Sequence, residues 1–176
     1  MAPSHIGLRV VMTVAALGLT LLPFTVSGGM PAVAAALVVL TVVAVARPES
    51  IAVLVLLVGQ AFHWTTTAPV PERLPQWLAV LCGAWLALLV HATASAAVTW
   101  PAKAPIPRRA LLRWAARAAV VGLAVVPVWA VAALTREQSL RGEVSMTYVA
   151  LAALTLLGGA VFLMARPSPA SGGARR

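Results

Sequence analysis

Two histidines lie within apolar stretches of this sequence, and each has a polar residue one helical turn away. Gln60 precedes His63 by three residues, and Ser95 follows His91 by four. Residues with these spacings share one face of an α-helix. Because an ionisable group is costly to bury in a bilayer, such residues are the first candidates for function. Gln60, His63, His91 and Ser95 therefore form the candidate intramembrane polar site.

Haem or metal binding is the first chemistry to consider for these histidines, since imidazole is a common axial ligand. Counted from the ends of the predicted spans, His63 and His91 differ in depth by roughly 6 to 10 Å at about 1.5 Å per residue. That offset is awkward for one iron, and no further ligand accompanies them. His91 and Ser95 also lack the G-x-S-x-G turn of a serine hydrolase. We expect no catalytic residue, metal or cofactor, and each imidazole hydrogen bonded to Gln60, Ser95 or a carbonyl.

A second set of candidate residues is basic and lies between Pro107 and Arg117, in the sequence PRRALLRWAAR. Three of its four arginines, Arg109, Arg113 and Arg117, recur every four residues, so a helix at the cytoplasmic face would place guanidinium groups against phosphate headgroups. Each basic residue near an anionic surface contributes about 1 kcal/mol. The alternative is a topology signal without a ligand. The candidate anionic-lipid contact consists of Arg108, Arg109, Arg113 and Arg117.

The composition indicates that these residues belong to an integral membrane protein. The chain has 176 residues, of which 61% are hydrophobic and 10% charged, and its mean hydropathy is +0.96. Soluble domains are about 45–50% apolar. There is no Asp or Asn, which excludes chemistry that needs paired aspartates, and the single cysteine, Cys82, excludes an intrachain disulfide. The net charge of +9 does not predict nucleic-acid binding, because the arginines cluster where membrane topology requires them.

Apolar segments of membrane-spanning length recur six times, so the predicted fold class is an all-α bundle of six transmembrane helices. A bilayer core of about 30 Å needs about 20 helical residues. Pro48 is expected to start the third helix, with Glu49 and Ser50 in its first turn. Residues 1–166 form the predicted membrane domain, and the tail 167–176 is predicted to be disordered. The spans are expected at about 8–26, 30–46, 48–66, 76–98, 115–134 and 144–164.

The fourth span carries small and polar residues at a strict four-residue spacing, which predicts a face for close helix packing. These residues are Gly83, Ala87, His91, Ser95 and Thr99.

The distribution of basic residues predicts that both termini are cytoplasmic, in a bacterial inner membrane. With this orientation three basic residues face outward, namely Arg73, Arg136 and Arg141. The other ten of the thirteen face the cytoplasm, as the positive-inside rule requires. They are Arg9, Arg47, Lys103, Arg108, Arg109, Arg113, Arg117, Arg166, Arg175 and Arg176.

The chain resembles uncharacterised actinobacterial multi-pass inner-membrane proteins in three features. These are the R-P-E-S turn at 47–50, the histidine of the fourth span and the R-R-A-L-L-R-W sequence at the start of the fifth. Their layout is similar to that of small membrane components encoded near MoxR-type ATPases and their von Willebrand-like partners. The resemblance implies no catalytic residue.

Three classes of function remain open. The first is a non-enzymatic subunit or scaffold of a cell-envelope complex, with a membrane protein or a second copy as partner. The second is a small-molecule transport component similar in size to the substrate-binding subunits of energy-coupling-factor transporters. The third is a redox or hydrolytic membrane enzyme that uses His63 and His91.

Overall fold

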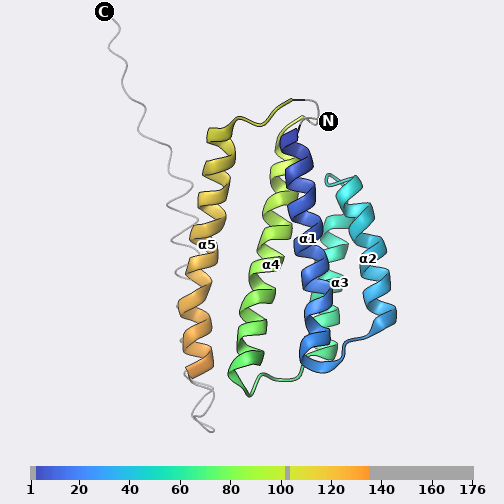
Figure 1. Cartoon of the computed structure of the whole chain (residues 1–176), viewed down its shortest axis with the longest axis vertical. Coiled ribbons are helices and arrows are strands. Elements are labelled where there is room, and N and C mark those ends of the chain that lie inside the picture. Colours follow the sequence, from blue (N-terminus) through green and yellow to red (C-terminus); the bar gives the residue numbers. More distant parts are fainter. Residues whose placement is uncertain (1–2, 102–103, 135–176) are drawn as a thin grey trace, which may run out of the picture. The chain divides into compact units, whose positions relative to one another are not determined.

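The computed structural model of the chain describes residues 3–101 and 104–134, and all secondary-structure elements in these ranges are α-helices joined by short loops (Figure 1). No strand occurs within these ranges, which confirms the all-α prediction for them. The predicted sixth span, 144–164, and the tail, 167–176, lie outside the described residues. The helices are α1 (Pro3–Ser27), α2 (Pro31–Ala46), α3 (Ala52–Thr67), α4 (Leu74–Thr99) and α5 (Arg108–Leu134).

Three of these helices are long and apolar enough to cross a membrane. They are α1, α4 and α5, with 25, 26 and 27 residues. The helices α2 and α3 are apolar but have 16 residues each. At about 1.5 Å per residue they extend about 24 Å, less than the roughly 30 Å of a bilayer core. The described structure therefore fits a membrane protein with three clear candidate spans.

The turn between α2 and α3 shortens the predicted third span. The Ser50 amide and hydroxyl both donate to the Arg47 carbonyl, at 3.0 and 2.7 Å. The Ser50 hydroxyl also accepts a hydrogen bond from the Ala52 amide, at 3.3 Å. These bonds close a turn over residues 47–51, so the helix begins at Ala52 and the prediction that Pro48 starts it was wrong.

The chain divides into two compact units, residues 1–122 and 123–176, and the described part of the second is the end of α5, residues 123–134. In the first unit, α1 lies between α4 and α2, and α2 pairs with α3 (Figure 1). The helices approach closely through small residues. Ala16 and Ala44 are fully buried, and a Cβ atom at Gly83 would lie 3.6 Å from Leu19 and Leu22 of α1. Small residues at such crossings are typical of membrane helix packing.

The predicted packing face of α4 is realised over part of its length. Gly83 is buried against α1 and Ala87 is half-buried, but His91 and Thr99 are exposed. The buried residues nearer the end of α4 are Val90, Thr93, Ala94 and Ala96. A four-residue spacing drifts around a helix of 3.6 residues per turn, so the stripe leaves the interface after about two turns.

Candidate functional site

Gln60 lies on the inner face of α3 and links it to α1. Its side chain is 3% exposed, and its amide nitrogen donates to the Ala16 carbonyl at 2.9 Å and to the Thr20 hydroxyl at 3.3 Å. The Thr20 hydroxyl itself donates to the same Ala16 carbonyl at 2.9 Å. A side-chain amide that reaches a backbone carbonyl on another helix fixes the register between the two helices. Gln60 thus connects α3 to α1 through buried hydrogen bonds.

His63 lies one turn further along α3 and is 1% exposed. Its ring lies beside that of Phe24 on α1, with 6.1 Å between the centroids and 49° between the planes. Neither ring nitrogen has a hydrogen-bond partner, and the Gln60 carbonyl oxygen has none either. The expected pairing of His63 with Gln60 or a carbonyl was therefore wrong, because the Gln60 amide reaches to α1 instead. A neutral imidazole has one donor and one acceptor, and His63 leaves both unused.

His91 and Ser95 lie apart from this buried pair, in a groove between the end of α4 and the start of α3. His91 is exposed and Ser95 half-buried. The groove has a volume of about 440 Å³. Its lining is mostly apolar and also includes the hydroxyl-bearing Ser50 from the 47–51 turn. The lining residues are Pro48, Ser50, Val53, Leu54, Leu57, His91, Ala94, Ser95 and Val98.

The structure does not bring the two histidines together. His91 shares its groove with Leu54 and Leu57, which precede His63 by nine and six residues. At about 1.5 Å per residue this separates the histidines by roughly 9 to 14 Å along the helix axes. One faces α1 and the other an open groove. Within the described ranges, no three His, Cys, Asp or Glu residues are grouped so that they could hold a metal ion.

The four arginines of the predicted lipid contact occupy the first three turns of α5, and all of them are exposed. The first turn of α5 contains no acidic residue. A helix N-terminus carries a partial positive charge, and like charges four residues apart repel, each effect costing a few tenths of a kcal/mol. An anion bound near these residues would relieve both effects. The electrostatics of this segment therefore favour a negatively charged ligand.

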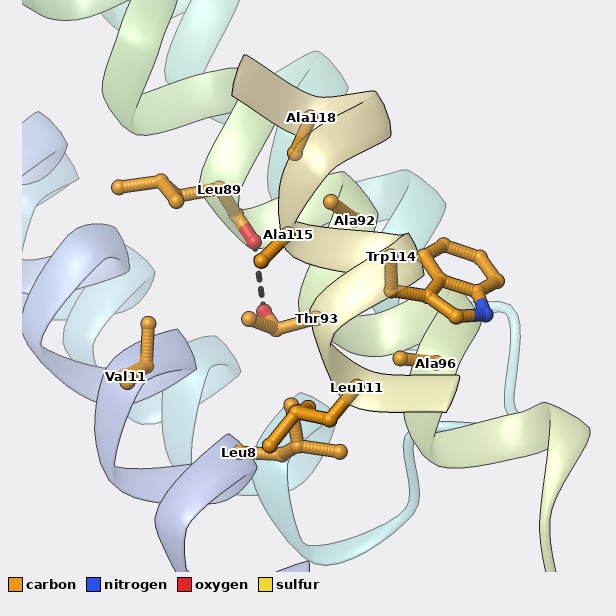
Figure 2. A pocket seen from close by; sticks show the side chains of 10 residues that line it. All are labelled: Leu8, Val11, Leu89, Ala92, Thr93, Ala96, Leu111, Trp114, Ala115 and Ala118. Carbon is orange, nitrogen blue, oxygen red and sulfur yellow. Dashed lines mark hydrogen bonds between the residues drawn. The ribbon is translucent and has the colours of Figure 1, made fainter. Parts of the chain in front are cut away.

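The start of α5 is held against α1. The Ile106 amide donates to the Ser4 hydroxyl at 3.2 Å, and both Ile106 and Ala110 are buried. Below this contact, α5 lines an apolar groove with α1 and α4, shown in Figure 2. The groove residues are Leu8, Val11, Leu89, Ala92, Thr93, Ala96, Leu111, Trp114, Ala115 and Ala118.

Four buried polar residues of the described chain were not singled out by sequence reasoning, namely His5, Thr20, Thr41 and Thr93. His5, near the start of α1, is 3% exposed, and its Nε2 has no hydrogen-bond partner. Thr20 accepts from Gln60, which is 40 residues away in the chain. No local spacing connects residues so distant in sequence. The burial of His5 could have been predicted from its spacing, because it lies three residues before Leu8 and so shares a face of the first helix with that apolar side chain.

Comparisons with protein-family models, with curated proteins and with solved structures gave no match for this chain. The class that the structure defines is an all-helical protein, over its described residues, with three helices long and apolar enough to span a membrane.

Proposed function

We propose that this chain is a multi-pass membrane protein that serves as a non-enzymatic subunit or scaffold of a cell-envelope complex. The observation that supports the membrane location in this proposal is the inverted polarity of α3. Gln60 and His63 are buried, whereas Leu54, Val58 and Phe62 of the same helix are 60%, 61% and 60% exposed. In water this arrangement would leave a large apolar surface uncovered. In a bilayer it is the expected one, because polar and ionisable groups face the bundle and apolar side chains face lipid or a partner helix.

The proposed topology has six spans and two cytoplasmic termini, in a bacterial inner membrane. The orientation is supported by the distribution of charge along the first unit. Successive helices alternate in direction, so the start of α1, the 47–51 turn and the start of α5 lie at one end, and the 68–73 loop at the other (Figure 1). The first end carries Arg9, Arg47 and the four arginines of α5, and the other end carries Arg73. Such a bias is the positive-inside signal.

Thiol labelling in whole cells tests this topology. In a Cys82→Ala background, Val70→Cys places a thiol on the 68–73 loop at a position that is 83% exposed, and Pro105→Cys places one before α5. An impermeant maleimide should label Val70→Cys in intact cells and Pro105→Cys only after permeabilisation. The opposite pattern would invert the orientation. Labelling of both in intact cells would refute the membrane topology.

The subunit role requires a partner protein that packs on an exposed apolar face of this chain. Helix α2 has such a face. Val39 and Val42 are each 66% exposed on this helix. A photocrosslinking amino acid at position 42, introduced in the native membrane, should give a protein adduct of defined mass. The matched control is Leu37, which is 4% exposed on the same helix. Lipid adducts alone at position 42 would contradict the subunit role on this face.

The exposed arginines of α5 are proposed to contact anionic headgroups. Arg109, Arg113 and Arg117 follow one side of the helix, and each guanidinium offers a planar fork of donors for phosphate oxygens. Long side chains near a helix end can also extend toward the interface while their stems remain in hydrocarbon.

A small-molecule transport component is the second candidate, and the groove with His91 supports it. Its volume of about 440 Å³ lies within the range of ligand pockets, roughly 300–1,000 Å³. Ser50, His91 and Ser95 supply polar groups on an apolar lining. A small polar compound that raises the Tm of the purified protein, with the effect lost in His91→Ala, would favour this role over the subunit role.

A further inference from the structure

The apolar groove between α1, α4 and α5 arises because α5 is attached at two points and stands away between them. At the upper point Ala110 is buried next to the Ile106–Ser4 hydrogen bond. At the lower point the Trp85 indole on α4 donates to the Gly122 carbonyl at 3.1 Å. A Cβ atom at Gly122 would lie 3.6 Å from Leu88, so the helices touch there. The space between the two contacts has a volume of about 180 Å³.

The lining of this groove suits a hydrocarbon chain. Thr93 is its only residue with a hydroxyl, and that hydroxyl donates to the Leu89 carbonyl of its own helix at 2.6 Å. The other lining side chains are alanine, leucine, valine and tryptophan. Figure 2 shows Leu8 and Leu111 at one end of the groove, with Ala115 facing it and the Trp114 indole nitrogen directed away. An occupant would therefore meet hydrocarbon and no free polar group.

The depth of the groove matches the outer part of one leaflet. The 26 residues of α4 extend about 39 Å, so about three residues at each end project beyond a core of about 30 Å. This places Ala96, which lines the groove, at the edge of the hydrocarbon. Leu111 lies at the same end of the groove, and Ala118 lies about 10 Å deeper. The groove thus runs inward from the headgroup boundary.

The charge at the mouth of the groove is positive. Arg108 precedes Leu111 by three residues and so shares its side of α5, about one turn closer to the headgroups. Arg109 is its neighbour, both are exposed, and both lie in the first turn of the helix, where the helix dipole favours an anion. A phosphate at this position would have its acyl chain beside the groove.

From these features we infer that the groove binds one acyl chain of an anionic phospholipid, whose phosphate is held by Arg108 and Arg109. This inference rests on the proposed membrane location. It assigns a bound lipid to a defined site, in addition to the general headgroup contact along Arg109, Arg113 and Arg117.

The test compares two substitutions of neighbouring alanines on α5. Ala115→Phe places a ring in the groove, and Ala116→Phe places the same ring on an exposed position that does not line it. Each variant is reconstituted in nanodiscs of phosphatidylcholine and phosphatidylglycerol, extracted in mild detergent, and weighed by native mass spectrometry. Ala115→Phe should retain about tenfold less phosphatidylglycerol, because the ring displaces several methylenes of the chain. Ala116→Phe should retain as much as the parent.

A charge variant separates the headgroup from the chain. The double substitution Arg108→Gln with Arg109→Gln should still retain lipid but lose the preference for phosphatidylglycerol over phosphatidylcholine. Equal retention by Ala115→Phe and the parent would overturn the inference. So would a fall in the Tm of Ala115→Phe without loss of lipid. A chain that does not enter nanodiscs at all would instead contradict the proposed membrane role.

Discussion

The interior face of α3 and the first turns of α5 both carry polar side chains at helical spacing, but the structure gives them opposite environments. Gln60 and His63 are almost fully buried against α1, and the Gln60 side-chain amide donates a hydrogen bond to a backbone carbonyl of that helix. The arginines of α5 are exposed, next to a helix N-terminus that adds to their positive charge. The difference indicates that the first region holds helices together, whereas the second is available to a ligand.

The largest expected effect is on the free energy of unfolding. It tests whether side chains are closely packed in the interior of α3 and unpacked on the exposed surface of α5. Leu56 on α3 is fully buried, and Leu112 on α5 is 69% exposed. Leu56→Ala should lower the free energy of unfolding by about 2–5 kcal/mol, because it leaves a cavity among close-packed helices. Leu112→Ala should change it by less than about 0.5 kcal/mol. Equal losses for the two variants, measured by reversible unfolding in detergent, would abolish the distinction between the regions.

The next effect concerns the ligand-binding side of the comparison. Changing Arg109, Arg113 and Arg117 together to glutamine should weaken binding to anionic bilayers by about 2–3 kcal/mol, at about 1 kcal/mol per charge. Binding would be measured in nanodiscs with increasing cardiolipin content. The free energy of unfolding should not fall, since the substitutions also remove repulsion between like charges. The control is Arg73→Gln, at the other end of the first unit, which should weaken this binding by at most a third as much. An equal loss would show that the arginines of α5 act only through the overall charge of the protein.

A smaller effect separates the two members of the buried pair. Gln60→Leu removes a hydrogen bond between helices and should destabilise the protein by about 0.6–2 kcal/mol. His63→Leu removes two unpartnered nitrogens and should be neutral or stabilising, because burying polar groups without partners is costly. A double-mutant cycle of Gln60→Leu with Thr20→Val should show coupling, as the two side chains are in contact. Marked destabilisation by His63→Leu would instead show that His63 has a polar partner in the membrane.

The smallest effect is expected at His91. Because this residue is exposed in the groove of α3 and α4, His91→Leu should change the free energy of unfolding by no more than about 0.5 kcal/mol. The thermal unfolding profile in detergent checks this. A larger change would mean that the imidazole supports the end of α4 and is not free for a ligand.

Much of the helical layout was predictable, because a helix that crosses a lipid bilayer must be a continuous run of apolar residues, and such runs can be read directly from the sequence. The lengths of the apolar runs placed α1, α2 and α4 to within about five residues, and glycines with positive φ at 28 and 29 end the first of them. The basic residues in the first turns of α5 were recognised from their spacing alone. The start of α3 was misplaced because proline at a first helical position and proline in a turn look alike in sequence. The hydrogen bonds of Ser50 decide between them.

What the sequence could not determine was which polar residues meet. It put Gln60, His63, His91 and Ser95 into one candidate site, because all four lie on apolar helices. Tertiary packing separates them, since α3 turns Gln60 and His63 toward α1 and leaves His91 and Ser95 in an open groove with Ser50. Contacts between residues more than 40 positions apart, such as that of Gln60 with Ala16, depend on which helix faces pack together. That choice is made by the fit of small residues such as Ala16 across the helix interfaces, and no local pattern encodes it.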